Sequence, residues 1–232
     1  MNILVTGATR GIGKAIAKEM MGAACSVYAV GRNLDELRRY DHYCQCNLAE
    51  DIATVEEFVA NNKIDILINN AGEYVYGEIE KMTPEEIEHI YHLNLITPVR
   101  LISKAVPYMK EKKWGRIINI GSISGLMGEA HASLYSSTKS GLFGLTKALG
   151  LELAEYNITV NTINPGWVDT TLGKTSIEDS DFSMGEIMDI IPQKRLVEPV
   201  EIAKLVKYLA SDDAKGITGQ LINLCAGMSV GI

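Results

Sequence analysis

The chain has 232 residues, 47% of them hydrophobic, and 22 basic residues stand against 29 acidic ones for a formal net charge of −7. This balance gives no long-range attraction for nucleic acid or an anionic membrane surface, so neither is expected as a partner. A chain of this length buries roughly 70% of its unfolded surface, and four cysteines without an export signal or membrane-length apolar run favour a reducing, cytoplasmic location.

Short apolar runs alternate with helix-like segments along the chain, which is typical of a parallel sheet covered by helices on both faces. The predicted strands are 2–6, 25–30, 42–48, 63–72, 115–125, 158–166 and 219–227, and the predicted helices are 13–22, a short one within 33–41, about 84–112, and 134–155. We therefore expect one dinucleotide-binding and catalytic domain over 1–232. Its fold class is α/β, a single doubly wound, Rossmann-type, seven-stranded parallel sheet.

The cysteines offer one candidate for metal binding, the pair Cys44 and Cys46. No second pair or histidine cluster completes the four ligands that a structural zinc site needs. We predict two buried strand thiols and no metal.

Glycines gather between the first strand and its helix, in Thr6-Gly-Ala-Thr-Arg-Gly-Ile-Gly13. Backbone amides and the positive end of the helix dipole would face a phosphate there. Gly7 permits the tight turn, Gly11 allows close approach to a pyrophosphate, and Gly13 lets the helix pack on the strand. Ordinary turns also contain such glycines, so this loop alone leaves both interpretations open.

Tyr135 precedes Lys139 by four residues, so both side chains lie on one helix face. Reduction of a ketone needs a proton donor for the carbonyl oxygen, and free tyrosine, with a pKa near 10, is a weak one. An ammonium group about 5 Å away stabilises the phenolate by about 3 kcal/mol, which predicts a lowered pKa for Tyr135. Taken alone, the same spacing also fits an ordinary amphipathic helix.

Six motifs occur together in a familiar order: TGxxxGxG at 6–13, Asn69-Asn-Ala-Gly72, Asn94, Ser122, Tyr135-x-x-x-Lys139 and Pro165-Gly166. Over essentially its whole length the chain therefore resembles the short-chain dehydrogenase/reductase family. The stretches "TGATRGIG", "GRIINIGS", "ITVNTINPG" and "LASDDAKGITGQLI" are most similar to bacterial 3-oxoacyl-[acyl-carrier-protein] reductases. The resemblance implies an enzyme that transfers hydride from a nicotinamide dinucleotide to a ketone.

The resemblance also implies four catalytic residues. Tyr135 would donate the proton, Ser122 would hold the substrate oxygen, and Lys139 would bind the nicotinamide ribose. Asn94 would bend its helix and carry a water that links Lys139 to solvent. His131 lies between Ser122 and Tyr135, and it either touches substrate or is simply solvated.

NADPH, or NADP+ in the reverse direction, is the expected cofactor. NAD enzymes place a carboxylate after the second strand, whereas this chain has Gly31-Arg32, and Arg10 lies in the glycine loop. Both guanidinium groups suit a 2'-phosphate. With Tyr135 and Lys139, the implied cofactor contacts are Gly7, Thr9, Arg10, Gly11, Ile12, Gly13, Arg32, Asn47, Leu48, Asn70, Ala71, Gly72, Pro165, Gly166, Val168 and Thr170.

Several departures leave the substrate open. Acyl-carrier reductases commonly carry a basic residue before "ITVN", where this chain has Tyr156-Asn157, although Lys112 and Lys113 keep part of a basic patch. The carbonyl substrate is therefore acyl-carrier-linked or another small carbonyl or sugar. Residues 172–191 are expected to form the substrate lid.

Two further expectations concern the class of protein and its assembly. A nucleotide-binding regulator without activity is the alternative class, although such a protein has no need of the full set of catalytic residues. We predict a homodimer or homotetramer, because the resemblance implies one and because helices 98–112 and 138–155 carry apolar residues that could pack on another copy.

Overall fold

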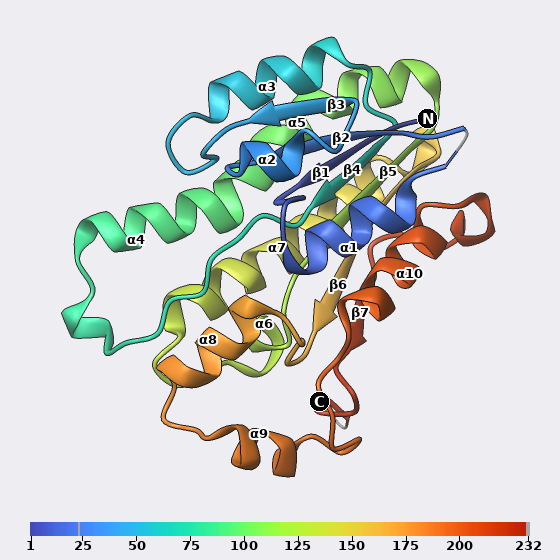
Figure 1. Cartoon of the computed structure of the whole chain (residues 1–232). Helices are drawn as coiled ribbons and strands as arrows, with labels where there is room; N and C mark the ends of the chain where they lie inside the picture. The colour runs from blue at the N-terminus through green and yellow to red at the C-terminus, as the bar shows by residue number, and fades with distance from the viewer. Residues whose placement is uncertain (23, 231–232) are drawn as a thin grey trace.

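The computed structural model describes residues 1–22 and 24–230, and a parallel sheet lies between two helical layers (Figure 1). The strands follow the order β3-β2-β1-β4-β5-β6-β7, and each neighbouring pair is parallel. Their bounds are β1 Asn2–Thr6, β2 Ser26–Gly31, β3 His42–Gln45, β4 Ile66–Asn69, β5 Gly115–Ile120, β6 Ile158–Pro165 and β7 Leu221–Leu224. The predicted fold class is confirmed.

Alternate residues of each central strand enter two separate cores. Ile3 and Val5 of β1 pack in the core beneath α1 (Gly11–Met20) and α10 (Pro199–Leu209), whereas Leu4 faces the opposite core. The opposite core is covered by α3 (Ile52–Asn61), α5 (Thr97–Lys112) and α7 (Ser133–Glu152). Burial on both faces explains why these strands appear in the sequence as continuous apolar runs.

The helix predicted over 84–112 is confirmed, and its middle turn is π-helical. It consists of α4 (Pro84–Tyr91), a π-helical segment at His92–Ile96, and α5. The helix predicted over 134–155 ends at Glu152 and is followed by a 3-10 turn, Ala154–Tyr156. The short helix α2 (Leu34–Leu37) forms as predicted, because the Asn33 side chain accepts a hydrogen bond from the Glu36 amide.

Other elements were not predicted or have different bounds. Helices α3 and α10 were missed; β-branched residues in α3 weaken its helical signal, although Asp51 caps its first turn. The strand predicted over 63–72 is shorter, because the chain leaves the sheet after Asn69. The remaining segments are α6 (Ser124–Met127), α8 (Thr171–Asp179), α9 (Met184–Ile190), and 3-10 turns Ile79–Lys81 and Asp212–Ala214.

The strand order reverses direction between β1 and β4. In doubly wound sheets the crevice at such a point, outside the carboxyl ends of the strands, is where ligands bind. Cys44 and Cys46 are both buried, and no group of three metal-ligating side chains gathers within residues 1–22 and 24–230. Within the same residues no helix is both long and apolar enough to cross a bilayer.

Candidate active site

A cavity of about 360 Å³ opens at the carboxyl ends of the strands, where the sheet order predicts a ligand. Every residue predicted to contact the cofactor borders it, and so does Ser122. Asn94 does not border it and lies buried behind Gly72. The volume of the cavity is within the range of small-molecule binding sites.

The glycine loop is packed so tightly that two of its residues have no room for a side chain. A Cβ on Gly13 would lie 2.2 Å from the Gly7 carbonyl oxygen and 2.4 Å from Asn70 Nδ2. Gly7 also has a φ of +67°, which side-chain-bearing residues rarely adopt. The loop therefore brings bare backbone amides to the start of α1, where the N-cap residue Arg10 makes no side-chain cap.

Thr6 joins the glycine loop to the segment after β4. Its hydroxyl oxygen accepts hydrogen bonds from the amides of Asn70 at 2.9 Å and Ala71 at 3.0 Å. Asn70 Nδ2 in turn donates to the Thr6 carbonyl oxygen at 2.9 Å. These three bonds hold the two walls of the crevice at a fixed separation.

The two arginines expected to meet a 2'-phosphate both border the cavity. Arg32 follows β2 directly, and its guanidinium group contacts Glu73 at 3.2 Å. Glu73 comes directly after the Asn69-Asn-Ala-Gly72 motif and was not identified from the sequence. Its position beside that motif was the available signal.

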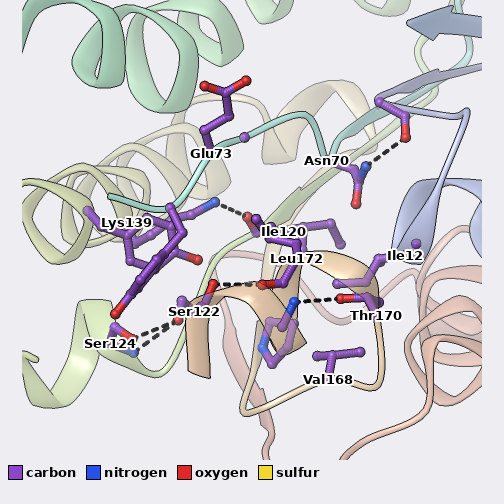
Figure 2. Close-up of a pocket in the computed structure, with 18 of the residues that line it drawn as sticks. Ile12, Asn70, Glu73, Ile120, Ser122, Ser124, Lys139, Val168, Thr170 and Leu172 are labelled. Atoms are coloured by element: carbon purple, nitrogen blue, oxygen red, sulfur yellow. Dashed lines mark hydrogen bonds between the residues drawn. The ribbon is translucent and has the colours of Figure 1, made fainter. Parts of the chain in front are cut away.

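Tyr135, Ser122 and Lys139 gather on one side of the cavity. The Lys139 ammonium nitrogen lies 5.5 Å from the Tyr135 ring centroid and donates to the Ile120 carbonyl oxygen at 2.9 Å. Ser122 follows β5, and Figure 2 shows it hydrogen-bonded to Ser124. The i,i+4 spacing on α7 therefore places a cation beside a phenol, as the sequence predicted.

The prediction of a lowered pKa for Tyr135 is wrong in this structure. Burial raises the pKa of Tyr135 to about 12, the hydrogen bond with Ser122 acts in the lowering direction, and the Glu129 carboxylate raises it further. Burial also lowers the pKa of Lys139 to about 8. The sequence argument counted the attraction between the two groups but omitted the cost of removing each charge from water.

Asn94 lies in the π-helical segment, which widens the helix at the predicted position of distortion. Its side chain accepts a hydrogen bond from the Glu73 amide at 3.0 Å and donates to the Glu73 carbonyl oxygen at 2.9 Å. A Cβ on Gly72 would lie 3.1 Å from Asn94 Oδ1 and 3.5 Å from Lys139 Nζ. Asn94 is thus fixed close to the buried ammonium group.

Glu129 is a second site residue that the sequence did not identify, although it lies between Ser122 and Tyr135. Its carboxylate accepts hydrogen bonds from the Tyr74 hydroxyl at 2.6 Å and the Ser124 hydroxyl at 2.7 Å. Ser124 also accepts from Ser122 at 3.2 Å, and the Tyr74 ring meets the Tyr135 ring edge-on at 5.1 Å. An acidic group is therefore connected to two of the predicted catalytic side chains.

Helices α8 and α9 lie within the segment expected to be the lid, and residues of both helices line the cavity. Thr170 caps α8 by accepting the Gly173 amide at 3.0 Å, and the Tyr76 hydroxyl donates to Asp181 at 2.9 Å. His131 is exposed and lies 5.4 Å from the Tyr76 ring, outside the cavity lining.

A doubly wound sheet with a glycine loop at its switch point, and a tyrosine and lysine paired beside the crevice, defines a dinucleotide-binding oxidoreductase class. The sequence model of the short chain dehydrogenase family matches residues 1–181. The chain belongs to this family.

Three comparisons describe its relatives. It is 37% identical to a 3-oxoacyl-[acyl-carrier-protein] reductase of Vibrio harveyi, over 97% of this chain and 96% of the relative. It is 37% identical to the granaticin polyketide synthase putative ketoacyl reductase 1 of Streptomyces violaceoruber, over 97% of this chain and 92% of the relative. The crystal structure of an actinorhodin polyketide ketoreductase variant with NADPH superposes with a TM-score of 0.91 at 33% identity, covering 99% of this chain and 97% of that structure.

Proposed function

We propose that the protein is an NADPH-dependent carbonyl reductase in which Tyr135 gives the proton to the substrate oxygen. The observation that carries this proposal is the position of Lys139 Nζ, 5.5 Å from the Tyr135 ring centroid at the wall of the cavity. Membership of an oxidoreductase family and the similarity to ketoacyl reductases support the same reaction.

The walls of the crevice fit a dinucleotide. The absent Cβ atoms of Gly7 and Gly13 leave bare amides at the start of α1, which suit a pyrophosphate. No carboxylate follows β2, and Arg10 and Arg32 supply charge-assisted donors for a 2'-phosphate. Pro165, Gly166, Val168 and Thr170 would hold the nicotinamide end, and Asn47, Leu48 and Ala71 the adenosine end.

Each catalytic side chain has a separate task. NADPH, when bound, supplies the hydride for the carbonyl carbon. The Tyr135 hydroxyl transfers its proton to the carbonyl oxygen, and the Ser122 hydroxyl donates a hydrogen bond to that oxygen as negative charge develops. The Lys139 ammonium group stabilises the phenolate that remains. Asn94, fixed by both backbone groups of Glu73, orders the path that returns a proton from solvent to Lys139.

The raised pKa of Tyr135 agrees with this role. With a pKa of about 12 the phenol keeps its proton at neutral pH, so it is present as the acid when reduction begins. The opposite reaction, alcohol oxidation, needs the phenolate and is disfavoured at neutral pH. The protonated phenol is therefore the form of Tyr135 that ketone reduction requires.

We propose a 3-oxoacyl group on an acyl carrier protein as the first substrate to test, since a 37% identical relative bears that name. A small ketone is the second candidate, and one observation favours it. Lys112 is paired with the buried carboxylate of Asp65, so it offers little free charge to an acidic carrier. Tyr156 occupies the position where the acyl-carrier reductases that the chain resembles commonly have a basic residue.

Loss of NADPH absorbance tests the reaction. The protein should reduce a 3-oxoacyl group presented as an N-acetylcysteamine thioester, and Tyr135→Phe should lower kcat by roughly a thousandfold while leaving NADPH affinity within about twofold. Arg32→Ala should raise KM for NADPH far more than KM for NADH. A panel of ketones without turnover would favour a nucleotide-binding regulator, and equal effects of Arg32→Ala on both dinucleotides would overturn the choice of NADPH.

To test whether the substrate is carrier-linked, the same acyl group is compared on acyl carrier protein and on N-acetylcysteamine. A kcat/KM at least tenfold higher on acyl carrier protein than on N-acetylcysteamine would identify the carrier-linked substrate, and equal values would identify the small carbonyl. We further propose that residues 172–191 close over the substrate as a lid. The homodimer or homotetramer and the cytoplasmic location stay predictions.

A further inference from the structure

Arg32, the arginine expected to receive a 2'-phosphate, already has an anionic partner. Its Nη1 lies 3.2 Å from Glu73 Oε1, and Glu73 Oε2 lies 2.9 Å from His89 Nε2. The three side chains come from separate segments: Arg32 from the end of β2, Glu73 from the loop after β4, and His89 from α4. In Figure 2 the Glu73 carboxylate points away from the Lys139 ammonium group, so it takes no part in the catalytic cluster.

Arg32 and Glu73 both border the cavity, so their contact lies where the cofactor would bind. A 2'-phosphate carries between one and two negative charges and would be drawn to the same guanidinium group that Glu73 contacts through Nη1. A carboxylate and a phosphate on one guanidinium group repel each other. The Arg32–Glu73 contact is therefore weakened when a 2'-phosphate reaches Arg32.

The neighbouring charges do not share this conflict. Lys14 is paired with Glu36 at 2.7 Å, and Arg10 has no acidic partner within 4.0 Å among residues 1–22 and 24–230. Arg10 is thus available to a phosphate without losing any contact. Glu73 is the carboxylate that opposes phosphate at this end of the cavity.

His89 provides a second hydrogen-bond partner for the Glu73 carboxylate. Its ring nitrogen contacts the carboxylate oxygen that Arg32 does not use, and it lies on α4, outside the cavity lining. When Arg32 turns to another anion, the carboxylate keeps this hydrogen bond. The arrangement allows Arg32 to exchange partners while Glu73 remains bonded.

We propose that Glu73 sets how strongly the protein distinguishes dinucleotides with and without a 2'-phosphate, by competing with that phosphate for Arg32. This inference rests on the proposed use of NADPH. A nucleotide without the phosphate leaves the Arg32–Glu73 pair intact and loses nothing, whereas one with it must displace the carboxylate. The protein should therefore prefer NADPH less strongly than it would with an unpaired Arg32.

Titration calorimetry with 2',5'-ADP and 5'-AMP tests the proposal without turnover. Glu73→Gln keeps the shape of the side chain and removes its charge. It should tighten binding of 2',5'-ADP by about two- to fivefold, the range for a partly exposed ion pair, and leave 5'-AMP binding unchanged. Glu85→Gln is the control for net charge, because Glu85 is an exposed acid on α4 that forms no ion pair with the described residues, and it should change neither affinity.

A double-mutant cycle separates the role of Arg32 from general repulsion. In an Arg32→Ala background the gain from Glu73→Gln should shrink, because the guanidinium group under competition is gone. The proposal is overturned if Glu73→Gln leaves 2',5'-ADP binding unchanged or tightens both nucleotides equally. If the natural protein instead binds 5'-AMP better and Glu73→Gln reverses that order, the NADPH assignment fails while the role of Glu73 stands.

Discussion

The Lys139 ammonium nitrogen lies 5.5 Å from the centroid of the Tyr135 ring, and its one hydrogen-bond acceptor in the described chain is the Ile120 carbonyl oxygen at 2.9 Å. Lys139 is only 5% exposed and has no carboxylate within ion-pair distance there. The protein therefore keeps a nearly uncompensated buried cation beside Tyr135. Burial lowers the pKa of this ammonium group to about 8, so Lys139 loses its charge within the pH range in which enzymes are usually assayed.

The reductive rate should fall at alkaline pH because Lys139 loses its charge. Since the pKa of Lys139 is about 8 and that of Tyr135 about 12, the cation is lost long before the phenol proton. At saturating NADPH and ketone, kcat should fall roughly tenfold per pH unit above that point. The arginine of Lys139→Arg keeps its charge, so kcat of this variant should be lower overall but should stay constant up to about pH 10. An identical alkaline fall in both proteins would assign the titration to another group.

The same buried cation should cost stability. A folded-state pKa lowered from 10.5 to about 8 means that the charged form is disfavoured in the fold. The unfolded chain binds more protons between these values, so the stability from this group is reduced below about pH 8 and recovers as pH rises toward 10.5. Lys139→Met should therefore raise the free energy of unfolding at pH 7 by about 2 kcal/mol, after allowing for the lost hydrogen bond.

Urea unfolding at pH 7 measures this gain. Lys147→Met is the matched control, because Lys147 lies on the same helix, α7, but is exposed. It should change stability by less than about 0.5 kcal/mol. If both proteins fold and Lys139→Met is less stable than the natural protein at pH 7, the buried charge of Lys139 does not destabilise the fold.

The sequence predicted those parts of the site that single segments encode. Three features can be recognised within short stretches of sequence: the glycine loop, the Tyr135-Lys139 spacing and the position of Arg32 after β2. The strand pattern then shows that these features lie at the carboxyl ends of the strands. Glu73 and Glu129 could not be assigned in this way. Each acquires its role from contacts with residues 16 to 55 positions away, among them His89 and Tyr74.

The pKa of Tyr135 shows a second limit. Spacing fixes which two groups meet, but the depth at which they are buried depends on every segment around them. For Tyr135 the desolvation outweighs the nearby charge, and no local pattern reports it. Helix α3 was missed for a related reason, since its apolar residues make a helix mainly by packing on α5.

Gly13 should tolerate no side chain, because a Cβ there would lie 2.2 Å from the Gly7 carbonyl oxygen. Gly13→Ala must push α1 away from β1, which should lower the free energy of unfolding by about 2 kcal/mol or more and weaken NADPH binding at least tenfold. Gly216→Ala has open space around its Cβ and should change stability by less than about 0.5 kcal/mol. Calorimetric unfolding and NADPH titration measure both, and equal behaviour of the two variants would contradict the packing argument.

Glu129 should hold the pKa of Tyr135 high, since its carboxylate disfavours a nearby phenolate. Glu129→Gln removes the charge and keeps one of the two acceptor oxygens that Tyr74 and Ser124 use, while the new amide nitrogen donates. Alcohol oxidation requires the phenolate, so its rate at a fixed alkaline pH should rise, and its pH profile should move to lower pH by about half a unit. Ketone reduction at neutral pH should change less, because the phenol keeps its proton in both proteins.

Asp181→Asn is the control for this change, because Asp181 also accepts a hydrogen bond from a tyrosine, Tyr76, but is not among the groups that shift the pKa of Tyr135. It should leave the oxidative pH profile in place. A shift of equal size in both variants would mean that general charge at the mouth, rather than Glu129, sets the acidity of the phenol. If Glu129→Gln is slower but its pH profile does not move, Glu129 acts by positioning Ser122 through Ser124. A positioning role changes the rate without changing the pKa of Tyr135.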